Sequence, residues 1–571
     1  MTAGEDKFER KKMNRRKGIK NIGLRNIPAQ DEVIPSKAER MSKNEAGGMT
    51  FKQSIVTKFF RALLTIASPT YYVKEEDIYQ RQLNIFKEMY DSYGIEAYIK
   101  LIEYASKVAF RPHGIILALV WAINNVKEND KRKIVELFDP QRGVIKSLNY
   151  LYQFIELNKQ LYAKSSSAKR RAINTWILGC YKQGNFEYQS AKFFQRSGWS
   201  IFDVLRISHP KFNEEGFSKI VEDIKAKAKE LKNYEYKTKF FKIWAEIRNL
   251  ALQNRVKEIA NLIVTHNIPR ELVPDNVRKE IEILKALMKT SPSLSFIKMI
   301  PELATYGVLV PNCEKETINF VEERIKKCAE VLHPIDLGIM ALVYPKGTSM
   351  RRNWIPIEGI AKTLSEATMQ AFIRYKLSKD NPFKGKKVFI AVDTSGSMRG
   401  GDVQGTGLYP IEIASIFAKL IGYLSDSYVS GTFSNRFIPY TFDFTASIEN
   451  VLEQLYEANC CCSTDMSSAI KYLIDKKIRV DAMFFITDDQ TWEGYNVDAL
   501  LDYYRKIFNK NCICVTINVV PAYENQAFDP EHPLNFWFNG FDAGIVKVIE
   551  EAIAGRSVSY THLTLPTTER V

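Results

Sequence analysis

The sequence predicts a protein of two unlike parts, an all-helical N-terminal part and a C-terminal α/β domain with a doubly wound sheet. Across residues 51–384, apolar side chains recur at a helical period near 3.6, with short breakers between the segments. Residues 388–392 are instead a short continuous apolar run, which is typical of a buried parallel strand. The two parts also carry opposite net charge, which supports a boundary near residue 385.

The helical part is predicted from successive amphipathic segments. Residues 114–126 are apolar on all sides, as in a buried helix. Breakers such as Arg111-Pro112 and Ser291-Pro292 separate the segments. Successive helices with short turns indicate an α-solenoid, and a compact helical bundle is the alternative. Further helices are expected at residues 145–161, 168–182, 236–250 and 256–264.

The α/β domain is predicted from strands that alternate with helices. Residues 388–392, 428–433 and 482–487 have the composition of buried strands, and the segments between them contain helical patterns. The expected helices lie at residues 407–424, 466–473 and 545–554.

Carboxylates and hydroxyls cluster in the loops that follow the predicted strands, where open α/β sheets bind their ligands. Hard oxygen donors without Cys or His favour Mg²⁺ or Mn²⁺ and leave coordination positions open for a partner's acidic group. A single Asp-x-Ser is more often a helix cap or a turn, but three such pieces in order at strand ends predict a metal site. Asp489 is an alternative to the last carboxylate. The expected ligands are Asp393, Ser395, Ser397, Thr464 and Asp488.

The excess of positive charge is confined to the helical part. Residues 386–557 contain 14 Lys and Arg against 22 Asp and Glu, a net charge of −8. The remaining tail is neutral and the whole chain is +15, so residues 1–385 carry +23. A surplus of this size favours a polyanionic partner such as a nucleic acid, although a basic charge that serves only solubility is the alternative.

The metal-site pattern, Asp-x-Ser-x-Ser with a later Thr and Asp, resembles the metal-ion-dependent adhesion site (MIDAS) of von Willebrand factor A (vWA) domains. In the helical part, Lys192–Ser200 and Asp203–Lys211 resemble the signature of the TROVE module of Ro-type RNA-binding proteins. The C-terminal part resembles the A domain of the same family, so the resemblance runs from about residue 51 to residue 553. Shorter matches are residues 70–72, 270–274, 333–334 and 539–542.

This resemblance implies a monomeric ring of HEAT-type helices that is closed by the vWA domain and has a positively charged central hole. It also implies that single-stranded 3′ ends of misfolded RNAs thread the hole, while small Y RNAs bind the basic outer face. The protein would be a ribonucleoprotein component for RNA quality control, which hands defective RNA to an exoribonuclease such as polynucleotide phosphorylase.

The resemblance also supplies candidate RNA-binding residues. Phe194 stands where the family usually has a basic residue, so one phosphate contact of Y-RNA-like binding is in doubt. Phe194 either stacks a base or packs in the core, and Trp199 is expected to pack. A solvated helix face is the alternative for Arg170 and Arg171, and a helix cap for His209. The candidates are Arg170, Arg171, Lys192, Arg196, His209 and Lys211.

The sequence favours recognition over catalysis. No general base, nucleophile or second acidic cluster is evident beside the expected metal site, so we expect no enzyme activity. The rival hypothesis is a metal-dependent protein-docking adaptor whose helical part is a scaffold. The eight Cys have no paired spacing, and no signal peptide or long apolar run is present, which predicts a cytoplasmic protein. Residues 1–50 are expected to be a disordered basic arm, and residues 557–571 a tail of uncertain origin.

Overall fold

The structure is a computed structural model. It describes residues 24–554 except 25, 45–46, 53, 65–74, 109–111, 163–165, 350–351, 379–380, 402, 404–405, 459–462, 489–490, 521–525, 540–545, 547–548 and 551. The predictions for residues 70–72, 489, 540–542 and 557–571 lie outside the described residues. In the described part of the chain, no helix is both long and apolar enough to cross a membrane.

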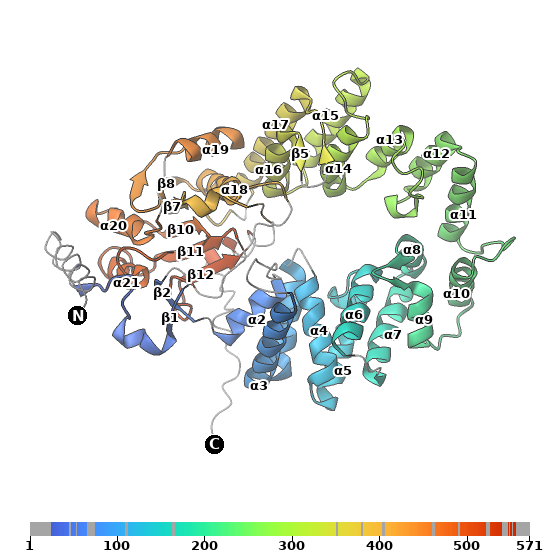
Figure 1. The fold of residues 1–571 in the computed structure, drawn as a ribbon, viewed down its shortest axis with the longest axis horizontal. Coiled ribbons are helices and arrows are strands. Elements are labelled where there is room, and N and C mark those ends of the chain that lie inside the picture. Colours follow the sequence, from blue (N-terminus) through green and yellow to red (C-terminus); the bar gives the residue numbers. More distant parts are fainter. Residues whose placement is uncertain are drawn as a thin grey trace, which may run out of the picture.

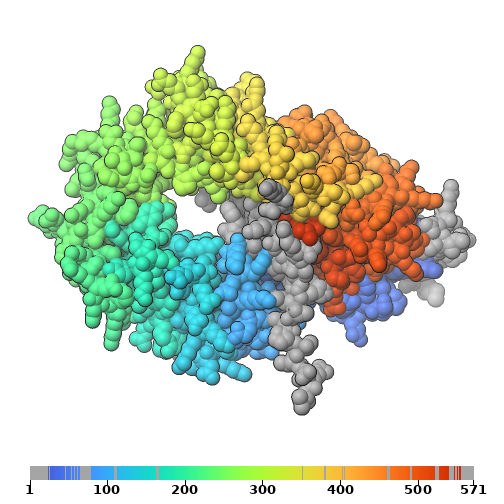
Figure 2. All heavy atoms as spheres, turned by 180° about the vertical axis from the view of Figure 1, so that it is seen from behind, coloured from blue at the N-terminus to red at the C-terminus, as the bar shows by residue number. Residues whose placement is uncertain are grey.

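The helical part forms an arc, and the α/β domain closes it into a ring (Figure 1). Seen from behind, the molecule has an opening that passes between the first half of the helical arc and the later helices (Figure 2). This arrangement confirms the ring-like helical solenoid and excludes the compact bundle. The helices of the arc are α2 (Ile55–Leu64), α3 (Glu75–Val108), α4 (His113–Asn125), α5 (Glu128–Glu136), α6 (Leu148–Leu161), α7 (Ser167–Lys182), α8 (Phe186–Lys192), α9 (Ile201–Ser208), α10 (Glu215–Ala228), α11 (Lys239–Leu252), α12 (Val256–His266), α13 (Ile281–Thr290), α14 (Ser293–Thr305), α15 (Lys315–Ala329), α16 (Pro334–Val343) and α17 (Glu358–Lys376).

The α/β domain contains a six-stranded sheet with the order β12-β11-β10-β7-β8-β9, in which only β9 is antiparallel. Because β7 and β10 are adjacent and parallel, their carboxyl ends meet at one edge of the sheet. The elements are β7 (Lys387–Asp393), α18 (Pro410–Leu424), β8 (Ser427–Phe433), β9 (Phe437–Pro439), α19 (Ile448–Glu457), α20 (Ser467–Asp475), β10 (Ala482–Thr487), α21 (Val497–Ile507), β11 (Ile513–Asn518) and β12 (Asn535–Asn539).

Both faces of the sheet are buried, which explains why the strands are continuous apolar runs. Val388 and Ile390 of β7 belong to the core that contains α18 and α19, whereas Phe389 belongs to the core that contains α20 and α21. The first of these cores continues into the helical arc, where Gly338 of α16 lies close to Ile416 of α18. The end of the arc and the α/β domain therefore share one hydrophobic core.

The expectation that residues 1–50 are disordered is wrong for the described residues from 24 onward. A 3₁₀ helix, η2 (Pro35–Arg40), precedes a small antiparallel pair of strands, β1 (Met41–Lys43) and β2 (Met49–Phe51). These residues pack on the α/β domain: the Gln30 backbone N–H donates to Gly494 at 3.0 Å, and that of Phe51 donates to Gln526 at 2.9 Å. We call residues 26–52 the N-terminal segment.

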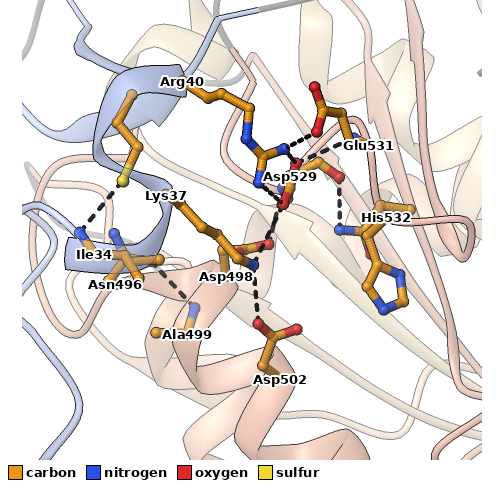
Figure 3. Close-up of polar contacts among 12 residues, drawn as sticks. Ile34, Lys37, Arg40, Asn496, Asp498, Ala499, Asp502, Asp529, Glu531 and His532 are labelled. Carbon is orange, nitrogen blue, oxygen red and sulfur yellow. Dashed lines mark hydrogen bonds and ion pairs between the residues drawn. The ribbon is translucent and has the colours of Figure 1, made fainter.

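Ion pairs also attach the N-terminal segment to the α/β domain (Figure 3). The Lys37 ammonium is 2.6 Å from Asp498, 2.9 Å from Asp502 and 3.4 Å from Asp529. The Arg40 guanidinium donates to both carboxylate oxygens of Asp529, at 2.6 and 3.1 Å. Lys37 and Arg40 thus pair with carboxylates more than 450 positions away in the sequence.

Candidate metal site and nucleic-acid surface

Three of the predicted metal ligands, Asp393, Ser395 and Ser397, lie at the carboxyl end of β7. Asp393 is the last residue of this strand, and its side chain is fully buried. One carboxylate oxygen of Asp393 accepts the Ser395 backbone N–H at 2.8 Å, and the other accepts the Thr487 hydroxyl at 2.7 Å. The hydroxyl oxygens of Ser395 and Ser397 are 3.2 Å apart. The Asp-x-Ser-x-Ser loop therefore folds back over its own carboxylate.

The other two predicted ligands come from neighbouring loops. Asp488 directly follows β10, the strand beside β7, and is buried. Thr464 is also buried and lies in the loop before α20. The Asp465 backbone N–H donates to the Ser434 carbonyl at 2.6 Å, which attaches this loop to the end of β8, the strand on the other side of β7.

Electrostatics at this edge of the sheet suit a cation. Burial and the nearby Asp488 carboxylate raise the pKa of Asp393 to about 7. A divalent cation would remove this mutual repulsion, and the donor set of carboxylates and hydroxyls fits Mg²⁺ or Mn²⁺. Among the described residues, no group of three or more His, Cys, Asp or Glu could hold a metal ion, so the hydroxyls of Ser395, Ser397 and Thr464 would have to contribute. The metal and its ligands stay predictions.

Two supporting residues at this site were not predicted from the sequence. The Thr487 hydroxyl donates a hydrogen bond to the second carboxylate oxygen of Asp393. Its position beside Asp488 at the strand end could have indicated this role. Glu493 accepts a hydrogen bond from the Ser463 hydroxyl at 2.8 Å and so steadies the loop that carries Thr464. No sequence pattern marks Glu493, because it lies 30 positions from its partner.

Four of the predicted RNA-binding residues lie around the junction of α7 and α9. Arg170 and Arg171 are exposed in the first turn of α7, and His209 and Lys211 are exposed just after α9. The Asn174 side chain, one turn beyond Arg170, donates to the Ser208 carbonyl at 2.9 Å and joins the two elements. We call Arg170, Arg171, His209 and Lys211 the α7–α9 basic patch.

The alternative role for the His209 imidazole was to cap the last carbonyls of α9. In the structure, the His209 backbone forms the cap instead. His209 ends α9 in the left-handed conformation, with φ of 47°, and its N–H donates to the Leu205 carbonyl at 3.0 Å. Its exposed imidazole makes no hydrogen bond to any residue that the structure describes. The side chain is therefore available to a ligand.

The remaining two predicted RNA-binding residues lie around a short hairpin, β3 (Gln195–Arg196) and β4 (Trp199–Ser200), that the sequence did not predict. Arg196 is exposed on this hairpin, and Lys192 ends α8 with its ammonium 3.9 Å from Glu271. Trp199 packs against the hydrophobic core as expected, and its ring N–H donates to Glu156 at 2.8 Å. The RNA-binding roles of all six residues stay predictions.

The comparisons with known proteins agree with this architecture. Residues 387–553 match the family model described as the Ro60 vWA domain. Over these residues the chain is similar to that family. The whole chain is 22% identical over 529 residues to the RNA-binding protein RO60 of Deinococcus radiodurans, covering 90% of this chain and 95% of the relative. It is also 22% identical over 474 residues to the RNA-binding protein RO60 of Caenorhabditis elegans, covering 72% of this chain and 71% of the relative.

The fold likeness extends beyond residues 387–553. The crystal structure of the Deinococcus radiodurans Ro (RSR) protein superimposes with a TM-score of 0.68 at 20% identity. The match covers 88% of this chain and the whole of that chain. The helical arc and its closure by a vWA domain are thus a shared fold.

Proposed function

We propose that this protein binds small noncoding, Y-like RNA and the single-stranded 3′ ends of misfolded RNAs, for quality control or for delivery to an exoribonuclease such as polynucleotide phosphorylase. The observation that carries the proposal is a ring with a central opening, built from a helical part of strongly positive charge. Relatives matched over most of their length are named RNA-binding proteins, which supports the same ligand. The free thiols of the described cysteines suit a cytoplasmic location.

The proposed mechanism is recognition without catalysis. Lysine and arginine contacts to phosphates supply most of the affinity, and access to a single-stranded end supplies selectivity. The α7–α9 basic patch and the side chains of Lys192 and Arg196 bind the RNA backbone. The protein acts as a single ring, and its MIDAS holds Mg²⁺ or Mn²⁺ through Asp393 and the neighbouring hydroxyls. A bound cation would there accept an acidic group of a partner.

The test is the binding of a structured RNA with and without a single-stranded 3′ tail, measured by fluorescence anisotropy at several salt concentrations. We expect tail-dependent affinity that falls by about a thousandfold between about 50 and 200 mM salt. The double variant Lys192→Ala, His209→Ala should bind more weakly. Its matched control is Lys326→Ala, Lys362→Ala, which removes exposed lysines from α15 and α17. Weak binding that depends on neither tail nor salt would refute the proposal.

The second candidate function is a metal-dependent protein-docking adaptor, favoured by the oxygen-rich edge of the vWA sheet. It predicts partner binding that requires Mg²⁺ or Mn²⁺ and is lost in Asp393→Asn, together with no salt-sensitive RNA affinity. The RNA titration above therefore separates the two functions.

A further inference from the structure

Lys227, in the last turn of α10, is enclosed by aromatic rings. Its ammonium lies 4.1 Å from the centre of the Phe194 ring and 3.9 Å from that of Trp244. The Phe241 ring centre is 5.7 Å away. In the described part of the chain, no carboxylate lies within ion-pair distance of this ammonium. We call Lys227 and these three rings the Lys227 cage.

A second cation completes this surface. Arg248, one turn after Trp244 on α11, is exposed and has its guanidinium 5.5 Å from the Trp244 ring centre. Lys227 and Arg248 thus approach the same indole ring, which is only half-buried. Two cations beside one another on an aromatic surface repel each other unless an anion lies between them.

The nearby ionisable groups do not supply that anion. Asp223, one turn before Lys227, is fully buried and accepts hydrogen bonds from the hydroxyls of Tyr234 and Thr238 and from two backbone N–H groups. Burial raises the pKa of both Tyr234 and Tyr236, so their hydroxyls stay neutral. On the α8 side, the Glu187 carboxylate accepts the Phe240 backbone N–H.

The positive charge of the Lys227 ammonium is therefore without a counter-ion among the described residues. Burial, and then the positive charge of Arg248, lower its pKa to about 7. The aromatic rings favour the charged form but carry no net charge, so they offset only part of the cost of burial.

We propose that Lys227 and Arg248 form a subsite for one phosphate group of a bound RNA, with the Trp244 indole as its floor. This subsite deepens the proposed function and rests on it. Arg248 and the indole are exposed enough to meet a polynucleotide from solvent, and a phosphodiester supplies the anion that the two cations lack. The elements α8, α10 and α11 lie on the side of the ring opposite the vWA domain (Figure 1), so the subsite is independent of the metal site.

Proton linkage makes the subsite distinguishable from general electrostatic attraction. A phosphate beside Lys227 favours the protonated amine, so RNA binding takes up a proton where the free amine is largely neutral. The affinity of the protein for RNA should then fall as the pH rises above 7, at a rate approaching about tenfold per pH unit. An arginine at this position stays charged and should abolish that dependence.

The experiment measures binding of a single-stranded oligouridine to the full-length protein by fluorescence anisotropy between about pH 6 and 8.5. It compares the unsubstituted protein with Lys227→Arg, Lys227→Met and the control Lys242→Met, which removes an exposed lysine from α11. We expect a flat pH profile for Lys227→Arg, and at low pH severalfold weaker binding for Lys227→Met than for Lys242→Met. Circular dichroism and thermal unfolding verify that each variant is folded.

The outcomes separate the subsite from the proposed function. If the protein binds RNA but Lys227→Arg keeps the full pH dependence, or Lys227→Met binds as tightly as Lys242→Met, the subsite is refuted and the proposed function stands. If the unsubstituted protein binds no RNA at any pH, the proposed function fails, and this inference fails with it.

Discussion

Removing the Lys37 ammonium should detach the N-terminal segment from the vWA domain. In Lys37→Met the side chain keeps its apolar stem, but Asp498 loses the cation 2.6 Å from its carboxylate. The Asp498 side chain is fully buried, and the Lys37 side chain is 17% exposed. Of its partners among the described residues, Asp498 would keep the Asp529 backbone N–H, which donates to it at 2.8 Å.

The size of the effect follows from this burial. Breaking a buried ion pair by removing one partner costs about 3–5 kcal/mol. We expect the low end, about 3 kcal/mol, because Lys37 is partly solvated and its second partner Asp502 is 42% exposed. Protonation limits the cost further: burial raises the pKa of Asp498 to about 6, against the opposing effect of Lys37. The loss should therefore be smaller at pH 5.5 than at pH 7.5.

Native-state hydrogen exchange measures this local opening, since the chain has more than one domain and global unfolding is not a single transition. A change of about 3 kcal/mol accelerates exchange on the order of 100-fold. The reporters are the amides of Met49, Phe51 and Lys52, which donate to Gln30, Gln526 and Arg40.

Two further variants make the reasoning refutable. Lys133→Met removes an exposed lysine from its ion pair with Glu96, whose side chain is 76% exposed, and should leave stability nearly unchanged. The double variant Lys37→Met, Asp498→Asn also removes the unpaired negative charge of Asp498 and should recover most of the lost stability. Unchanged reporter amides in Lys37→Met, or the same acceleration in Lys133→Met, would contradict the argument.

Three other predictions concern the metal site, the core and Lys227. Mg²⁺ or Mn²⁺ should raise the thermal unfolding midpoint of the protein but not of Asp393→Asn, and EDTA should reverse the rise; an equal rise in both would exclude Asp393 as a ligand. Gly422→Ala should cost about 1–3 kcal/mol in denaturant unfolding, because its Cβ would lie 2.0 Å from the buried Phe444 ring, whereas Gly400→Ala should be nearly neutral. The folded-state pKa of Lys227, about 7, lies below its ordinary value of 10.5. The unfolded chain therefore holds more protons above pH 7, and stability should rise between about pH 7 and 10, a rise that Lys227→Met should lack.

The parts of the fold that the sequence predicted are those in which burial imposes a repeating pattern. The apolar run at residues 388–392 became β7 because both faces of that strand are covered. The helix expected at residues 168–182 became α7 within one residue of its expected start. The β3–β4 hairpin was missed because two residues per strand are too few for a periodicity.

The candidate sites were predictable to the extent that their residues are close in the sequence. Asp393 and Ser395 form a local motif, and the Ser395 backbone N–H donates to the Asp393 carboxylate. Lys227 carries no such signal, because two of the rings that enclose it come from α11 and the third, Phe194, comes from the connection between α8 and β3.

The N-terminal segment shows why composition can mislead about order. A charged and polar sequence predicts disorder only if its charges stay solvated. Here carboxylates of the negative vWA domain pair with Lys37 and Arg40, although the segment as a whole has four basic and four acidic side chains and no net charge. In a solenoid each helix contacts mainly its neighbours, so the ring closes only through contacts at its two ends. One end shares a hydrophobic core with the vWA domain, whereas the N-terminal segment is held by ion pairs, backbone hydrogen bonds and a small apolar cluster. Ion pairs weaken as salt rises and apolar contacts do not, so the N-terminal closure is where the ring should open first.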